Sequence, residues 1–127
     1  MRITLETIPH SRQRYESAGD WREDVSGNAH ILVSAMGNDD YEFLVAIHEL
    51  VEMWLCKKRG ITDESVTAFD IAFEEKRQPG DLSEPGDDPA APYQNEHGVA
   101  TAVERLMCAA LGLSWQEYER TVQGLSQ

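Results

Sequence analysis

The segment Tyr41–Cys56, YEFLVAIHELVEMWLC, carries the strongest structural signal of the chain. Twelve of its sixteen residues are apolar, aromatic or thiol, and they recur at steps of three and four residues, as a helix with one apolar face requires. Asn38, Asp39 or Asp40 can cap the start of this helix, and Gly60 can end it. We therefore expect a long amphipathic helix in the middle of the chain.

Other elements are expected on both sides of this helix. Before it, residues 2–8 and 30–35 alternate apolar with polar side chains and are rich in branched residues, which is typical of short strands. After it, helical spacing predicts helices over residues 63–76, 96–111 and about 115–122. The predicted class is therefore α+β, with a small antiparallel N-terminal sheet packed against three to four helices.

The length of 127 residues is that of one domain. We expect a single domain over residues 1–127, with a β-rich part at 1–37 and a helical part at 41–123. Residues 78–92 interrupt the helical part with four of the five prolines, two glycines and four acids. Such a long loop is either a lid or binding segment, or a solvated connector.

The composition is strongly acidic. Twenty-three Asp and Glu against eleven Lys and Arg give a formal net charge of -12. This charge repels phosphate backbones and anionic lipids, so it argues against nucleic-acid and membrane partners, and it suits a cation, a basic partner or solubility alone. The chain has no apolar run long enough for a membrane span. Its two cysteines, Cys56 and Cys108, indicate reduced thiols and a cytoplasmic protein.

The most specific motif is His48-Glu49-Leu50-Val51-Glu52. His48 and Glu52 are spaced i,i+4, so their side chains lie on adjacent turns of one helix face. Two such donors form the helical half of many metal sites. The alternative is an acidic outer face with one exposed histidine.

This motif resembles the active helix of the zincin metallopeptidases, whose signature is His-Glu-x-x-His. The resemblance implies that His48 is a metal ligand and that Glu49 is the general base acting on a zinc-bound water. Glu52 would take the place of the second histidine. This HExxE variant departs from the family pattern, and the change also admits Mn or Fe. The whole chain is also similar to small phage or prophage proteins, which suggest no activity.

The expected helix at 63–76 contains a second candidate. Its buried face is expected to consist of Val66, Phe69 and Phe73. Asp70 lies within this stripe, where an ionised carboxylate costs several kcal/mol unless it is paired or binds a cation. Asp70 is thus a metal ligand or an acceptor for a ligating histidine, with Glu74 one turn later on the same side. Alternatively, Asp70 caps a turn or pairs with an arginine such as Arg105.

The expected helix at 96–111 contains a third candidate pair. Its core stripe is expected to consist of Val99, Val103, Leu106, Met107 and Ala110. His97 and Glu104 lie together at the margin of this stripe, about 10.5 Å apart along the axis, too far to share one ion. His97 is the ligand candidate, although it could be an ordinary half-buried histidine. Glu104 could orient His97, pair with Arg105 or bind a second ion.

The candidate residues on these three helices can come together if the helices pack around one core. His48, Glu52 and His97 would then form a two-histidine, one-carboxylate site with open positions for water, and Asp70 could replace Glu52 or His97. This ligand set serves hydrolytic zinc and also non-haem iron. We expect a divalent metal, zinc before Mn or Fe.

Three functions fit these residues. The first is a zincin-like metal-dependent hydrolase of a small peptide or another small molecule, with an edge strand near 30–35 aligning an extended peptide. The second is a non-catalytic acidic protein that recruits a basic protein partner. The third is a Mg-dependent nucleotide pyrophosphatase using Glu49 and Glu52. Its second carboxylate pair, however, would have to be Glu84 and Asp87, in the proline-rich loop.

Overall fold

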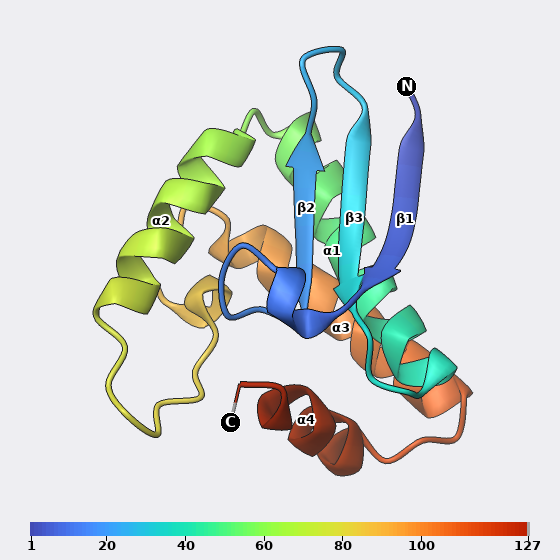
Figure 1. The fold of residues 1–127 in the computed structure, drawn as a ribbon. Coiled ribbons are helices and arrows are strands. Elements are labelled where there is room, and N and C mark those ends of the chain that lie inside the picture. The colour runs from blue at the N-terminus through green and yellow to red at the C-terminus, as the bar shows by residue number, and fades with distance from the viewer. Residues whose placement is uncertain (127) are drawn as a thin grey trace.

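The N-terminal third forms a three-stranded sheet in a computed structural model that describes residues 1–126 (Figure 1). The strand order is β1-β3-β2, with β1 at Ile3–Ile8, β2 at Gly19–Glu23 and β3 at Ala29–Ser34. β1 pairs with β3 in parallel, and β2 pairs with β3 in antiparallel fashion. The sheet is therefore mixed, with β3 at its centre.

The α+β class is confirmed, but the sheet is not wholly antiparallel as predicted. The difference arises from β2, which lies in the polar stretch between the two predicted strands. β2 and β3 form a hairpin whose turn contains Gly27 at a φ of 79°. Because β2 returns the chain, β3 runs in the same direction as β1. β2 lacks the apolar alternation of a half-buried strand, so the sequence carries no clear signal for it.

Four helices follow the sheet: α1 at Asp39–Lys58, α2 at Asp63–Glu75, α3 at Gln94–Ala110 and α4 at Trp115–Gly124. Three of them begin at side-chain caps. Asn38 accepts the N–H of Tyr41, Thr62 that of Ser65, and Ser114 that of Glu117. Between α2 and α3, the proline-rich loop contains one short 3-10 turn, η2, at Pro85–Asp87.

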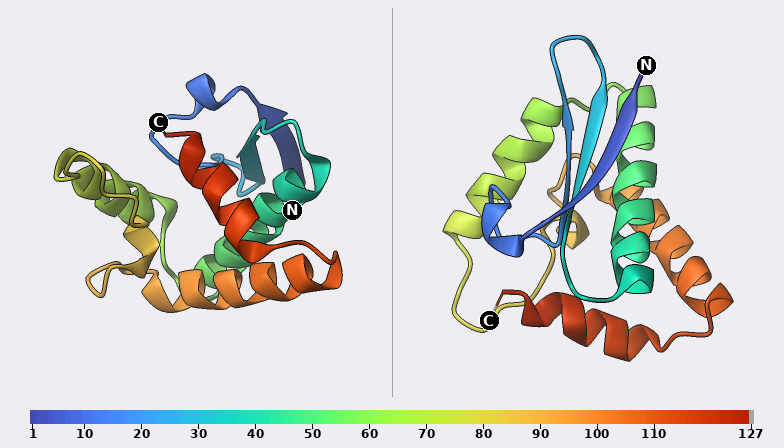
Figure 2. Two further views of the ribbon diagram at one scale, coloured as in Figure 1. Left: turned by 90° about the horizontal axis from the view of Figure 1, so that it is seen from below. Right: turned by 45° about the vertical axis from the view of Figure 1, so that its right-hand side comes forward.

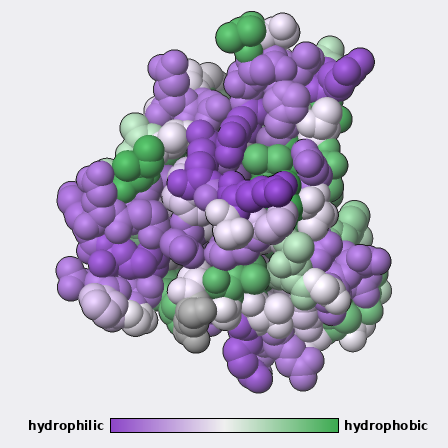
Figure 3. All heavy atoms as spheres, viewed as in Figure 1, coloured by the Kyte–Doolittle hydropathy of each residue, from purple (hydrophilic) through white to green (hydrophobic). Residues whose placement is uncertain are grey.

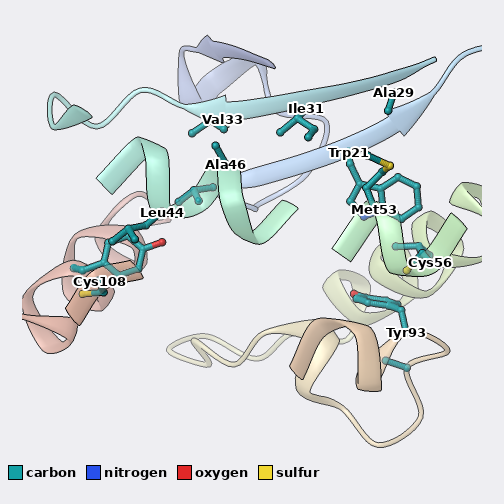
Figure 4. Packing of buried hydrophobic residues seen from close by; sticks show 14 residues of the cluster. Trp21, Ala29, Ile31, Val33, Leu44, Ala46, Met53, Cys56, Tyr93 and Cys108 are labelled. Carbon is teal, nitrogen blue, oxygen red and sulfur yellow. The ribbon is translucent and has the colours of Figure 1, made fainter. Parts of the chain in front are cut away.

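The elements stack in three layers. α1 packs on one face of the sheet, and α3 crosses α1 on the side away from the sheet (Figure 2). Ala29, Ile31 and Val33 of β3 point towards α1, where they meet Ala46 and the neighbouring apolar side chains (Figure 4). α2 flanks β2, and α4 packs beside α3. This arrangement places α1 between the sheet and α3, so that its side chains can meet partners from both.

The buried face of α3 differs from the predicted one. Its fully buried residues are Glu96, His97, Ala100, Glu104 and Cys108. Val99 and Leu106, predicted for the core, are 44% and 68% exposed. The helix thus turns a polar face inward although an apolar one is available. Burying charged groups is costly unless they form hydrogen bonds or ion pairs, so His97 and Glu104 need polar partners inside the fold.

The outer surface is mainly hydrophilic in the view of Figure 3, with small separate hydrophobic patches. Within residues 1–126, none of the helices combines the length and the apolar character that a membrane crossing requires.

Candidate metal site

Three buried side chains from α1 and α3 meet at one point. Nε2 of His48 lies 3.2 Å from Oε2 of Glu52, and Nδ1 of His97 lies 2.9 Å from the same oxygen. The two ring nitrogens are 3.2 Å apart. The i,i+4 spacing brings His48 and Glu52 together, while His97 arrives because α3 crosses α1 with its polar face inward. The predicted convergence of these three residues is thus present in the fold.

The outer nitrogen of His48 is engaged by a carboxylate. Nδ1 of His48 lies 2.7 Å from Oε1 of Glu104, and Oε2 of Glu104 accepts a hydrogen bond of 2.5 Å from the hydroxyl of Tyr118. With its proton on Nδ1, the ring presents the lone pair of Nε2 to the central point. Histidines that bind metals commonly have such a carboxylate behind them, which fixes the tautomer.

The outer nitrogen of His97 faces the proline-rich loop. Oε2 of Glu84 lies 2.8 Å from Nε2 of His97, and Oδ1 of Asp87 lies 3.3 Å from it. Gly86, between these acids, packs so closely on the ring that a Cβ at this position would overlap it. The loop therefore positions His97 by both charge and shape. Glu84, Asp87 and His97 also form a second, more exposed group of three donor atoms.

Glu52 is oriented in the same way. Its Oε1 accepts a hydrogen bond of 3.1 Å from Nε1 of Trp21 on β2, which leaves Oε2 at the central point. Each of the three side chains thus points one possible metal-ligand atom towards the other two. Its second polar atom contacts a neighbouring residue outside the triad.

The spacing of the three inner atoms fits a metal ion. Ligands at about 2.0–2.1 Å from a tetrahedral zinc lie about 3.3 Å from each other, close to the 2.9–3.2 Å found between these atoms. His48, Glu52 and His97 could therefore form a metal site. An ion held by these three side chains would have at least one further coordination position for water or another ligand.

The electrostatics of the triad follow from its burial and close contacts. Burial opposes ionisation of Glu52, but the two histidines outweigh it and lower the pKa of Glu52 to about 2. Burial lowers the pKa of His97, but its contacts with Glu52 and Glu84 raise it to about 10. Burial likewise opposes the protonated form of His48, but Glu104 and Glu52 raise its pKa well above the usual value. Without a metal, protons therefore supply the positive charge that this site favours.

Glu49 lies beside the triad. Its side chain packs against Gly19 at the start of β2, where a Cβ would come within 2.6 Å of Cγ of Glu49. Burial raises its pKa well above the usual value, and the charge of Glu52 adds to this effect. The Glu49 carboxylate receives no hydrogen bond from the residues that the structure describes. Its carboxyl group therefore binds a proton more strongly than a free glutamate does.

A cavity of about 970 Å³ opens over the site. β2, α2, α4 and the loop at 78–87 contribute to its walls, and His48, Glu49, Glu52 and His97 line it. A small organic molecule or a short peptide segment fits a volume of this size.

The other two predicted site residues lie elsewhere in this cavity. Asp70 is buried, but it is not among the three converging side chains. Its carboxylate accepts hydrogen bonds from the hydroxyls of Tyr93 and Tyr15, the latter at 3.2 Å. Burial, together with the charge of Glu52, raises the pKa of Asp70 to about 6 although the Tyr93 hydroxyl lowers it. Glu74 instead pairs with Arg77 through contacts of 2.7 and 2.8 Å.

Sequence reasoning missed several residues of the site. The sequence does not identify Trp21 and Tyr118 as hydrogen-bond donors to the acids, because no local pattern reveals a donor that comes from another element. The sequence suggests that Glu104 orients His97, but in the fold its carboxylate contacts Nδ1 of His48 instead. The sequence shows Glu84 and Asp87 only as a carboxylate pair in the loop, and their approach to His97 depends on how the loop folds.

Comparisons of the chain with protein families, with curated proteins and with solved structures find no match. The function is therefore inferred from the residues and their geometry.

Proposed function

We propose that the protein is a metal-dependent hydrolase of amide bonds in small peptides or related small molecules, with its metal held by His48, Glu52 and His97. One observation carries this proposal. Three donor atoms converge within 3.2 Å while the opposite end of each side chain meets a protein group, and the cluster opens into a cavity. A purely structural ion would not require this access.

Zinc suits the donor set best. Two imidazoles and one carboxylate are the ligands of many hydrolytic zinc sites, whereas a harder ion such as Mg²⁺ prefers oxygen ligands alone. Mn or Fe could also bind two histidines and a carboxylate. When bound, such an ion lowers the pKa of coordinated water and polarises a carbonyl.

Glu49 is the proposed general base. It lines the same cavity as the triad and is not occupied by another hydrogen bond. Burial and the charge of Glu52 raise the pKa of Glu49 well above its usual value, so its carboxylate binds a proton more strongly than a free glutamate, as a group that takes a proton from water must. Gly19 provides the space for its side chain.

β2 is the proposed guide for an extended substrate. The expected edge strand near 30–35 is in fact the central strand β3, so its backbone groups are already paired on both sides. β2 is an edge strand instead, and Gly19, Asp20 and Trp21 at its start line the cavity. Asp63 already accepts the backbone N–H of Glu23, and the Ser17 hydroxyl donates to the carbonyl of Gly19, so the middle of the strand is the part left for a substrate. A substrate backbone could pair with this edge and place a carbonyl near the triad.

The setting of the reaction follows from the charge and the thiols. Cys56 and Cys108 are both buried and free, which favours a cytoplasmic protein. The net charge of -12 disfavours nucleic acids and anionic membranes as partners and leaves peptides or other small molecules as substrates.

Metal content is the first test. The purified protein should contain about one equivalent of zinc by elemental analysis, and His48→Ala, Glu52→Ala and His97→Ala should reduce it to a trace. His30→Ala is the matched control, because this histidine lies on β3 and contacts Asp24 instead of the triad. Equal trace metal in the wild type, the control and all three variants would refute the metal site.

Activity is the second test. The zinc-loaded protein should cleave members of a short-peptide library, read by mass spectrometry, and Glu49→Gln should keep the zinc while lowering the rate by about a hundredfold or more. If the metal-loaded protein cleaves no peptide, the metal has a structural role only. Cleavage of a nucleoside triphosphate with Mg²⁺ alone would favour the pyrophosphatase alternative, and tight binding of basic proteins without cleavage would favour the interaction protein.

A further inference from the structure

Asp70 is a buried acid that the proposed reaction does not use. It is 6% exposed and lies on the inner side of α2, in the wall of the same cavity as the triad. Among the residues that the structure describes, the hydrogen-bonding partners of its carboxylate are two neutral groups, the hydroxyls of Tyr15 and Tyr93. Within residues 1–126, no lysine, arginine or histidine nitrogen lies within 4 Å of its carboxylate. Asp70 thus combines burial with the absence of a counter-ion.

Three separate segments build this place. Tyr15 comes from the loop before β2, Asp70 from α2, and Tyr93 from the residue before α3. The Tyr93 hydroxyl donates to Oδ1 of Asp70, while the Tyr15 hydroxyl lies 3.2 Å from Oδ2 of Asp70 and 3.1 Å from Oδ1 of Asp20 and shares its one proton between the two carboxylates. Asp70 and both tyrosines line the cavity. Two tyrosine hydroxyls orient a carboxylate but do not neutralise it, because a phenol with a raised pKa keeps its proton.

The surrounding charge is one-sided. Eleven of the described residues that line the cavity are Asp or Glu, and two are Arg. Both arginines are already engaged, since Arg77 pairs with Glu74 and Arg105 stacks on the ring of Trp115 at 4.5 Å. The alternative of an Asp70–Arg105 pair is therefore not realised. A cavity of this kind attracts cations and repels anions.

Tyr93 connects Asp70 to the triad. Its hydroxyl donates to Asp70, and its ring lies 6.2 Å from the ring of His97. One substrate residue could therefore place its side chain at Asp70 while its backbone carbonyl lies near the three metal donors.

We propose that Asp70, held by Tyr15 and Tyr93, binds the cationic side chain of a substrate residue next to the hydrolysed bond. The substrate class is therefore peptides containing arginine or lysine. The assignment of the bond rests on the proposed function, whereas the binding of the cation rests on Asp70 and the cavity alone.

Two probe peptides test this subsite, acetyl-Ala-Arg-Ala-amide and the same peptide with citrulline in place of arginine. Citrulline has nearly the same shape but no charge. By calorimetry, the wild-type protein should bind the arginine peptide about tenfold to a hundredfold more tightly, the usual range for a charge-assisted contact. Equal affinity for the two peptides would overturn the proposal, and this comparison needs no variant.

Variants locate the effect. Asp70→Asn should remove the preference for arginine, while Glu75→Gln, an exposed acid on the same helix, should retain it. A preference that survives in a folded Asp70→Asn protein also overturns the proposal. Arginine preference without cleavage would support the subsite and contradict the hydrolase, whereas cleavage of both peptides at equal rates would do the reverse.

Discussion

The two histidines of the triad are held in different ways. His48 lies on α1 and contacts Glu104 of α3, which in turn accepts a hydrogen bond from Tyr118 of α4. His97 lies on α3, but its outer nitrogen faces Glu84 and Asp87 on a loop, and both acids are more than half exposed. The orientation of the His48 ring is thus fixed by residues of the packed helices, whereas that of the His97 ring is fixed by a surface loop. Stability and metal affinity should therefore be coupled at His48 and separable at His97.

The strongest test of this difference is Glu104→Ala. It leaves the Nδ1 proton of His48 and the Tyr118 hydroxyl without a partner in a buried place. We expect metal binding about tenfold to a hundredfold weaker and a free energy of unfolding lower by about 1–3 kcal/mol. Metal titration and chemical denaturation measure the two effects.

Glu96→Ala is the matched control for this variant. Glu96 is a second buried acid on α3, but it pairs with Arg59 at 2.6 Å, away from the triad. This variant should lose stability and keep its metal affinity. If both variants weakened metal binding equally, Glu104 would have no specific part in orienting His48.

A smaller effect is expected from Gly86→Ala on the loop side. The added methyl would overlap the His97 ring and push it or the loop away. Gly86 is buried, but Glu84 and Asp87 beside it are exposed, so the loop can shift to relieve the overlap. We expect metal binding to weaken by about tenfold and the free energy of unfolding to fall by about 1 kcal/mol, the lower end of the cost of overpacking.

Gly98→Ala is the control, because this glycine follows His97 on α3 and has open space around it. It should stabilise the helix by about 0.5–1 kcal/mol without changing metal affinity. If Gly86→Ala bound metal as tightly as Gly98→Ala, the loop would not position His97.

The smallest expected effect is a change of sign in the pH dependence of stability. The pKa of His97 is raised to about 10 in the folded, metal-free protein, against about 6.5 when unfolded. The stabilisation by its proton is complete below about pH 6.5 and is lost as the pH rises towards 10. Zinc needs the neutral rings, so its stabilising effect grows over the same interval.

The melting temperature should therefore fall by a few degrees between about pH 6.5 and 8.5 in a chelator and rise with zinc. Thermal unfolding followed by circular dichroism in the two buffers gives the comparison. Parallel curves would show that protons and zinc do not compete for the triad.

The local patterns of the chain predicted much of this molecule. The helices, and the cap at Asn38, depend on neighbours within a few residues, so they follow from the sequence. The pairing of His48 with Glu52 also follows, because i,i+4 spacing on a helix fixes it. The side of α3 that faces inward was predicted wrongly, since apolar spacing favoured Val99 and Leu106.

What the sequence determined by itself is therefore the set of helices and the half of the site that lies on one helix. Tertiary structure decided the rest: that His97 faces α1, that Glu104 supports His48, that Trp21 orients Glu52, and that Asp70 lies apart with two tyrosines. The physical reason is the range of the forces involved. Backbone hydrogen bonding and helical periodicity act within a few residues, whereas the free energy of burying a polar face depends on partners from distant parts of the chain.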